Sequence, residues 1–353
     1  MDLDSKKILK TLNPRKIWVP VVLGLGIVVY LFFSDPDITV DKLNLVFDAT
    51  LLPIFLAILV FSCRFVGYVF RIKSITNNEL TWTSSLYVII LWEFASAVTP
   101  SVVGGTAVAV FILWKEGIKP GKALGFVLLT AIFDNMFFVL AAPLTLILGM
   151  ENVFPAVTDS SALLGNSMNL LFFLSYGLIT IYTFIMAFAL LINPRLFKWI
   201  IIKITSIKIL KRWQYAAYER GTEMILASDQ LKGMGKKFWL YLSLSTIFIW
   251  SSRYFLLNFL MVSFTKISIG EHVFIFGKQI ILWVVMLISP TPGSSGAAEY
   301  FFPFFFEENL GDYTLIVNLL WRLFTYYPYL LLGAIFLPRW IKRVFFHAGK
   351  IND

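Results

Sequence analysis

The sequence predicts an all-α polytopic membrane protein with about six full transmembrane helices, two broken re-entrant hairpins in an inverted repeat, and both termini in the cytoplasm. Apolar residues make up 58% of the 353 positions, charged residues make up 14%, and the mean hydropathy is +0.79. Ordinary soluble domains do not have this composition. Several apolar runs can cross a hydrocarbon core about 30 Å thick, which takes about 20 helical residues. We therefore expect a single transmembrane domain over residues 1–353.

The charge and cysteine content narrow the possible functions. The formal net charge is +9, but most Lys and Arg residues lie between apolar runs or at their ends. Membrane topology explains this distribution better than nucleic-acid binding does. Cys63 is the only cysteine, which excludes an intrachain disulfide framework and a Cys-based zinc site. We expect no cofactor and no metal.

Two membrane-crossing helices are expected first. A basic N-terminus precedes an apolar stretch at 17–33, which lacks the small-residue pattern of a signal-peptidase site and is predicted to be an uncleaved helix. An acidic loop follows on the outside. The run 51–70 then returns the chain to the cytoplasm, where Arg71 and Lys73 follow it. On this topology Arg71 reaches from the helix end to the membrane surface.

The apolar segments 84–114 and 273–305 are each predicted to enter the membrane and leave on the same side. Basic residues bracket the first segment, and acidic residues follow the second. Helix-breaking prolines and glycines lie near the centre of each, where we expect the hairpin to turn. The expected turn residues are Thr99, Pro100, Gly104, Gly105, Thr291, Pro292, Gly293 and Gly296.

The other apolar runs complete the predicted topology. Residues 123–149 cross outward and residues 168–192 cross back. A basic linker at 194–237 is expected in the cytoplasm, partly as helix along the membrane surface. Residues 238–264 then cross outward and residues 314–337 return, which leaves a basic C-terminal segment inside.

Two parts of the chain, 51–149 and 238–340, resemble each other and are predicted to run in opposite directions. Each has an arginine in its first helix, and an Ile-Leu-Trp sequence shortly before the proline and glycines of its hairpin. The matching positions are Arg64 with Arg253 and Trp92 with Trp283. Inverted repeats with broken helices in matching positions are typical of secondary transporters. Chance similarity between apolar segments is the alternative.

Charged residues inside the predicted membrane segments are the candidate binding residues. Because a charge near the bilayer centre costs roughly 2.5–3.5 kcal/mol on insertion scales, such side chains should face protein or a water-filled cavity. In the functional interpretation, arginines hold an anionic headgroup, while Glu93 and Asp134 act as counter-ions or proton carriers. In the structural interpretation, the charges only fix helix packing through salt bridges, such as Asp134–Arg322 and Glu93–Arg64. The candidates are Arg64, Glu93, Asp134, Arg253, Arg322 and, ranked below them, Lys278 and Glu299.

Residues 291–299, Thr-Pro-Gly-Ser-Ser-Gly-Ala-Ala-Glu, resemble the Thr-Pro-Gly-Gly-x-Gly-x-x-Glu signature of the lysylphosphatidylglycerol synthase transmembrane-region family. These are flippase-like integral membrane proteins, including the UPF0104 type. Ser294 replaces a usual glycine, and Thr-Pro and Gly-Gly-Thr elements at 99–106 also fit. The resemblance covers about residues 51–339. It implies the translocase part alone, without the soluble synthase domain of longer relatives, and a homodimer.

We therefore expect translocation of a lipid or lipid-linked headgroup across the cell inner (cytoplasmic) membrane. The resemblance implies a membrane phospholipid or a polyprenyl-linked lipid as the partner. An intramembrane lipid-modifying enzyme is the main alternative, with chemistry at carboxylates such as Glu93. However, His272 and His347 lack a metal-ligand or triad setting, so we expect no catalytic residues. A structural subunit of a membrane complex is the third possibility.

Overall fold

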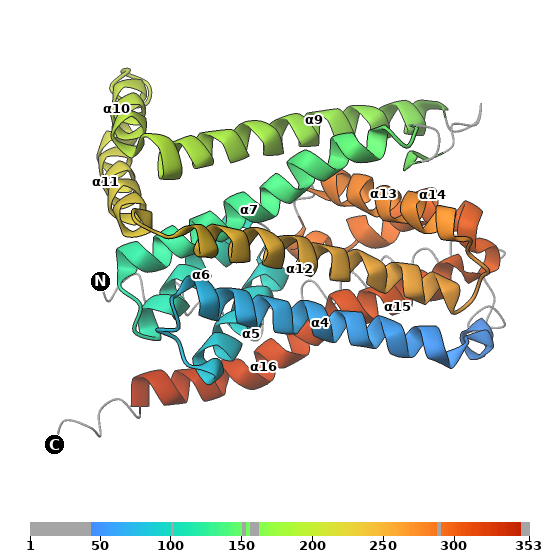
Figure 1. Cartoon of the computed structure of the whole chain (residues 1–353). Helices are drawn as coiled ribbons and strands as arrows, with labels where there is room; N and C mark the ends of the chain where they lie inside the picture. The colour runs from blue at the N-terminus through green and yellow to red at the C-terminus, as the bar shows by residue number, and fades with distance from the viewer. Residues whose placement is uncertain (1–43, 100–101, 150–152, 156–161, 288–290, 347–353) are drawn as a thin grey trace.

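The computed structural model describes residues 44–99, 102–149, 153–155, 162–287 and 291–346, and the predicted helix at 17–33 lies outside them. All regular elements in the described residues are helices (Figure 1), which confirms the all-α class. The first are α4 (Leu51–Ile75), α5 (Trp82–Val98), α6 (Val102–Lys115) and α7 (Pro120–Leu146). Next come α9 (Ala162–Ala187), its π-helical continuation (Phe188–Ile192), α10 (Pro194–Thr205) and α11 (Gln214–Leu231). The last are α12 (Lys236–Val262), α13 (Ile269–Met286), α14 (Ala297–Leu310), α15 (Thr314–Thr325) and α16 (Tyr327–Ile341). Short helical turns are Leu45–Asp48, Lys211–Trp213, Pro292–Ser294, Gly311–Tyr313 and Lys342–Phe346.

Six helical stretches in the described residues are long and apolar enough to cross a membrane. They are Leu51–Ile75, Pro120–Leu146, Met168–Ile192, Lys236–Val262, Ile269–Met286 and Pro292–Phe345. Many of their large apolar side chains are exposed, among them Leu144, Leu178 and Leu244. Apolar surface on this scale is unfavourable in water and suits a hydrocarbon environment. The chain therefore has the surface of a multi-pass membrane protein.

Two helix boundaries differ from those that hydropathy predicts. Helix α4 continues to Ile75 instead of ending at residue 70, because the charged side chain of Arg71 is accommodated by buried partners. The predicted span 314–337 is broken at Tyr326, whose φ and ψ of −129° and −59° separate α15 from α16. Pro328 explains the break, since a proline cannot donate the helical hydrogen bond of its own turn.

The helix pairs α5/α6 and α13/α14 are arranged at opposite ends of the bundle, and α4 and α12 pack side by side along its length (Figure 1). Within each pair the two helices pack against each other, so each pair forms a helical hairpin. The short turn Pro292–Ser294 contacts α5. The tips of the two hairpins therefore meet inside the bundle.

The expected turn residues do not all lie in turns. Thr99 ends α5, and residues 291–296 lie between α13 and α14, as predicted, whereas Pro100 lies outside the described residues. Gly104 and Gly105 belong to α6, the second helix of the hairpin, so the prediction that these paired glycines break a helix is wrong. Gly105 serves packing instead, because a Cβ at this position would collide with the Ser96 side chain of α5.

Helices α10 and α11 lie across one end of the bundle, beside the end of α9 and the start of α7 (Figure 1). Asn193 caps α10 by accepting a hydrogen bond from the Leu196 N–H, and Pro194 occupies the first turn. This end is also where α4 ends and α12 begins. The basic linker predicted at 194–237 thus forms a helical layer over the bundle end.

Candidate functional site

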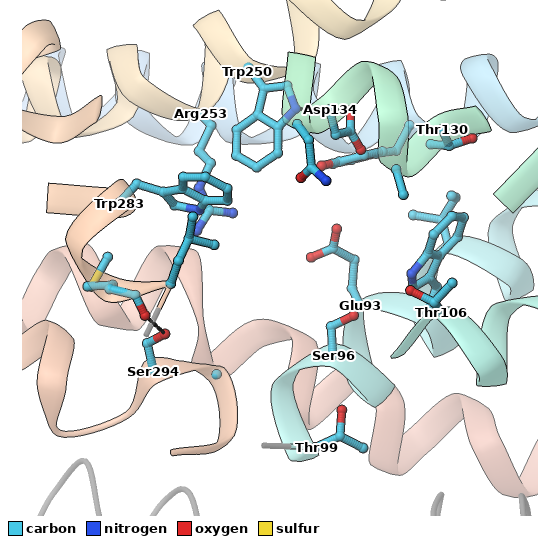
Figure 2. A pocket seen from close by; sticks show the side chains of 18 of the residues that line it. Glu93, Ser96, Thr99, Thr106, Thr130, Asp134, Trp250, Arg253, Trp283 and Ser294 are labelled. Atoms are coloured by element: carbon cyan, nitrogen blue, oxygen red, sulfur yellow. Dashed lines mark hydrogen bonds between the residues drawn. The ribbon is translucent and has the colours of Figure 1, made fainter. Parts of the chain in front are cut away.

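A cavity of about 600 Å³ lies where the two hairpin tips meet (Figure 2). Helices α4, α5, α6, α7, α12, α13 and α15 all contribute to its wall. Polar and charged lining residues are Tyr68, Arg71, Glu93, Ser96, Thr99, Thr106, Thr130, Asp134, Asn135, Arg253, Thr291, Ser294 and Arg322. The remaining lining residues are one glycine and nine apolar residues, namely Gly293, Ile72, Ile89, Trp92, Ala131, Trp250, Trp283, Met286, Leu287 and Trp321.

The structure brings four of the seven predicted charged residues to this cavity, namely Glu93, Asp134, Arg253 and Arg322. The side chains of Glu93, Asp134 and Arg253 point into it from α5, α7 and α12 (Figure 2). The other three predicted residues do not line it. Arg64, Lys278 and Glu299 are held in contacts behind the wall or away from it.

Arg71 and Asp134 form a bidentate ion pair at one side of the cavity. The guanidinium donates to the two carboxylate oxygens at 2.6 and 2.9 Å, and also to the Thr246 hydroxyl at 3.0 Å. The Trp250 indole N–H donates to Asp134 at 3.0 Å. Only 3% of Arg71 is exposed. The prediction that Arg71 reaches the membrane surface is therefore wrong, as is the predicted pairing of Asp134 with Arg322.

Arg64 lies behind Glu93 and holds it toward the cavity. The guanidinium donates to the two Glu93 oxygens at 3.3 and 3.4 Å, which confirms the predicted pair. Arg64 also donates to the Tyr329 hydroxyl and lies 4.8 Å from the centre of the Tyr68 ring. Exposure is 4% for the Arg64 side chain and 21% for the Glu93 side chain. The carboxylate, rather than the arginine, faces the open space.

Glu299 pairs with Arg322 on the opposite side. The Arg322 Nε–H donates to Oε1 at 2.8 Å, and the Gly296 backbone N–H donates to Oε2 at 2.7 Å. The carboxylate thus neutralises the arginine and also caps the start of α14. Nη2 of Arg322 has no hydrogen-bond partner among the described residues. Glu299 positions Arg322, which itself lines the cavity.

Lys278 belongs to a different polar contact. Its ammonium group donates to the Asn309 side chain at 2.9 Å and lies 3.6 Å from a carboxylate oxygen of Glu308. Both partners are at the end of α14, away from the hairpin tips. The prediction of Lys278 as a binding residue of the same site therefore finds no support in its position.

Arg253 differs from the other three arginines. Among the described residues it makes no ion pair or hydrogen bond, and its guanidinium carbon lies 5.5 Å from the centre of the Trp250 ring. In the part of the chain that the structure describes, four arginines lie in or behind the wall, together with three carboxylates that each pair with one of these arginines. These are Arg64, Arg71, Arg253 and Arg322 against Glu93, Asp134 and Glu299. Counted over these described residues, the site has one positive charge in excess.

Tryptophans form much of the remaining wall. Trp283 stacks on Phe138 with ring centroids 3.4 Å apart, and Trp250 meets Phe138 edge to face at 4.6 Å. Sequence reasoning used Trp92 and Trp283 only as repeat markers and missed Trp250. Its position one helical turn before Arg253 was a usable signal, because residues three apart share a helix face. These ring contacts stabilise the positions of Trp250 and Trp283 in the wall of the cavity.

Tyr326 connects the two hairpin tips. Its hydroxyl donates to the Ala97 carbonyl of α5 at 3.1 Å and lies 3.5 Å from the Pro292 carbonyl. Its ring also lies 4.2 Å from the guanidinium carbon of Arg322. Tyr326 is the residue at which α15 and α16 separate, so the helix break places this side chain between the tips.

The comparison with known proteins agrees with the resemblance at 291–299. A family model described as the lysylphosphatidylglycerol synthase TM region matches residues 17–333. The chain belongs to this family. It is also similar to a UPF0104 membrane protein of Archaeoglobus fulgidus, at 27% identity over 280 residues, which cover 75% of this chain and 79% of that protein. The match to the lysylphosphatidylglycerol synthase TM region includes every residue that lines the cavity.

The signature of the lysylphosphatidylglycerol synthase TM region has a structural explanation in this chain. Gly293 has φ of +57°, and a Cβ there would collide with the Tyr326 ring. Gly296 has φ of +85°, and the Glu299 carboxylate binds its N–H. Ser294, where the family usually has glycine, has φ of +53°, a conformation that costs a side-chain-bearing residue energy. The signature glycines thus shape the tip that faces the cavity.

Proposed function

We propose that this chain translocates a lipid or lipid-linked headgroup with one negative charge across the cytoplasmic membrane, and that it does so without catalysing a reaction. The observation that carries the proposal is Arg253 in the central cavity, a guanidinium with no counter-ion among the described residues. An anionic headgroup would supply that counter-ion and accept hydrogen bonds from its donor fork. The cavity volume of about 600 Å³ lies within the range of small-molecule sites.

The arrangement of the hairpins supports alternating access. We place α5/α6 as a re-entrant hairpin from the cytoplasmic side and α13/α14 as its inverted counterpart from outside, with both termini cytoplasmic. Their position at opposite ends of the bundle (Figure 1) supports an inverted repeat of 51–149 and 238–340. In many transporters, substrate sites lie where two such broken segments meet near the membrane midplane.

The repeat also offers a reason for the unpaired arginine. If Arg64 corresponds to Arg253, and Trp92 to Trp283, then the position of Glu93 corresponds to Val284. In the first half the carboxylate neutralises its arginine, with N–O distances of 3.3 and 3.4 Å. In the second half a valine stands at that position and supplies no charge. The two halves thus differ at the point where an anion would bind.

The charges facing the cavity would also limit the substrate. The headgroup phosphate would bind Arg253, while the exposed parts of Glu93 and Asp134 would repel a second negative charge. Acyl or polyprenyl chains would remain in the lipid, because closely packed tryptophans form the wall nearest the arginine and leave no channel for a long chain. A singly charged phosphodiester satisfies these conditions better than a phosphomonoester does.

Leaflet exchange in proteoliposomes tests the proposal. Purified protein is reconstituted with headgroup-labelled phosphatidylglycerol, a labelled cationic lysyl derivative or labelled polyprenyl phosphate, and an external quencher reports exchange. We expect Arg253→Gln to slow exchange of the anionic lipid by at least about tenfold, the equivalent of one charge-assisted hydrogen bond. Lys278→Gln is the matched control, since it removes a membrane-helix charge that does not line the cavity.

The outcomes separate the alternatives. Equal exchange rates in the wild type and Arg253→Gln overturn the role of the arginine. Faster exchange of the cationic lipid than of the anionic lipid overturns the proposed selectivity for a negatively charged headgroup. If no lipid exchanges, with or without an ion gradient, an intramembrane enzyme or a structural subunit becomes the better explanation, and turnover of the added lipids distinguishes those two.

A further inference from the structure

Residues 194–213, which comprise α10 and the turn up to Trp213, combine positive charge with exposed apolar side chains. The segment has six basic residues and no acidic one: Arg195, Lys198, Lys203, Lys208, Lys211 and Arg212. None of the α10 residues is buried. The large exposed apolar residues are Leu196, Trp199, Ile204, Ile207, Ile209 and Trp213.

The orientation of α10 is determined by its packing on α11. Gly221 of α11 allows close approach, because a Cβ there would lie 3.1 Å from the Lys198 Cα. The Lys198 ammonium donates to the Thr222 hydroxyl at 2.8 Å and lies 3.8 Å from the centre of the Tyr218 ring. Helix α11 in turn packs on α7. The exposed residues of α10 are therefore presented outward from a rigidly mounted helix.

The apolar surface of α10 continues that of a membrane-spanning helix. Helix α9 and its π-helical end lead directly into α10, and Leu191 and Ile192 at this end are 38% and 72% exposed. Exposed apolar residues of a candidate span lie against hydrocarbon. In Figure 1, α10 and α11 lie across the end of the long helices, as an element parallel to a membrane surface would.

We propose that residues 194–213 bind the surface of an anionic phospholipid leaflet. The apolar residues insert at the boundary between headgroups and acyl chains, and the basic residues contact lipid phosphates. A surface segment that combines exposed Trp, Leu and Ile side chains with Lys and Arg has these two preferences, and clusters of four to eight basic residues select anionic lipids. Lys203 lies 4.7 Å from the Trp199 ring and Arg212 lies 4.1 Å from the Trp213 ring, which places cations at the edge of the inserted face.

Site-specific fluorescence in the full-length protein tests the insertion. Since Cys63 is the only cysteine, a Cys63→Ser background permits one label at Ile207→Cys and, as the control, at Glu219→Cys on the exposed side of α11. Vesicles contain phosphatidylcholine with phosphatidylglycerol. We expect lipids spin-labelled near the glycerol to quench the label at 207 at least about threefold more than the label at 219. Aqueous iodide should show the opposite order.

Charge variants test the lipid class. Quenching at 207 by spin-labelled phosphatidylglycerol should exceed quenching by spin-labelled phosphatidylcholine by about threefold or more. Lys203→Gln with Lys208→Gln should bring this ratio close to one. The control pair Arg220→Gln with Lys232→Gln removes two cations that already pair with Glu223 and Asp229, and should leave the ratio unchanged.

Three results would overturn the proposal. Free access of iodide to position 207 means that the face is in water. Equal quenching by the two lipids means that insertion is not selective for anionic lipid. Protection from both quenchers, together with disulfide crosslinking between two copies at position 207, means that a second copy of the chain covers this face.

Discussion

Replacing Arg71 by methionine tests the ion pair that sequence reasoning missed. The change removes three hydrogen bonds of 2.6, 2.9 and 3.0 Å, two of them to Asp134. Removing one partner of a buried pair costs about 3–5 kcal/mol, because the other charge is left uncompensated. Asp134 is 19% exposed to the cavity and retains the Trp250 N–H, so we expect the lower end, about 3 kcal/mol.

A double-mutant cycle separates the interaction energy of the Arg71–Asp134 pair from the other effects of changing a residue in α4. Asp134→Asn leaves Arg71 buried without its counter-ion and should cost a similar amount. In the double variant Arg71→Met with Asp134→Asn neither charge remains, so we expect most of the loss to be recovered, with a coupling energy of about 2 kcal/mol. The assay is unfolding by sodium dodecyl sulfate in mixed micelles, followed by tryptophan fluorescence.

Arg253→Met is the comparison that makes this experiment specific. Arg253 lacks an ionic partner in the described part of the chain, so its replacement should change the unfolding free energy by less than about 1 kcal/mol while it impairs lipid exchange. Additive losses in the Arg71 and Asp134 cycle would refute the reasoning, as would an Arg253→Met loss as large as that of Arg71→Met.

Three further substitutions test the hairpin tips and the charge count. Gly293→Ala places a Cβ against the Tyr326 ring at φ of +57°. We expect this change to lower the free energy of unfolding by about 1–3 kcal/mol. Gly235→Ala is the control, because no atom lies within 4 Å of a Cβ there and φ is negative. Ser294→Gly should raise the unfolding midpoint and increase the free energy of unfolding by up to about 1 kcal/mol, because it relieves the backbone strain at φ of +53°. A lower midpoint would mean that the Ser294 hydroxyl stabilises the protein by more than the strain costs. Glu93→Gln leaves two arginines of the described site, Arg64 and Arg253, without an ionic partner in place of one. Leaflet exchange should therefore shift toward doubly charged phosphomonoester lipids, and an unchanged order of lipid preference would contradict the charge count.

The helical class and most membrane spans could be predicted from the sequence, because the length of an apolar run measures directly whether a helix can cross a bilayer. The runs around α4, α7, α9 and α12 are examples. The prediction was wrong where a local signal depended on distant residues. Arg71 looks like the polar end of a helix until Asp134 of α7 and Thr246 of α12 are seen to bind it.

The candidate binding residues show the same difference between what the sequence predicts and what only the tertiary structure decides. The sequence alone determined which charges must be sheltered, since the cost of placing a charge in hydrocarbon is a property of each residue and its depth. Glu93, Asp134, Arg253 and Arg322 could be named on that ground, and all four line one cavity. Only the tertiary structure decided their partners, because an ion pair requires side-chain atoms from different helices to lie within a few ångströms. That geometry distinguishes Arg253, which has no ionic partner within the described ranges, from the arginines whose ion pairs hold helices together.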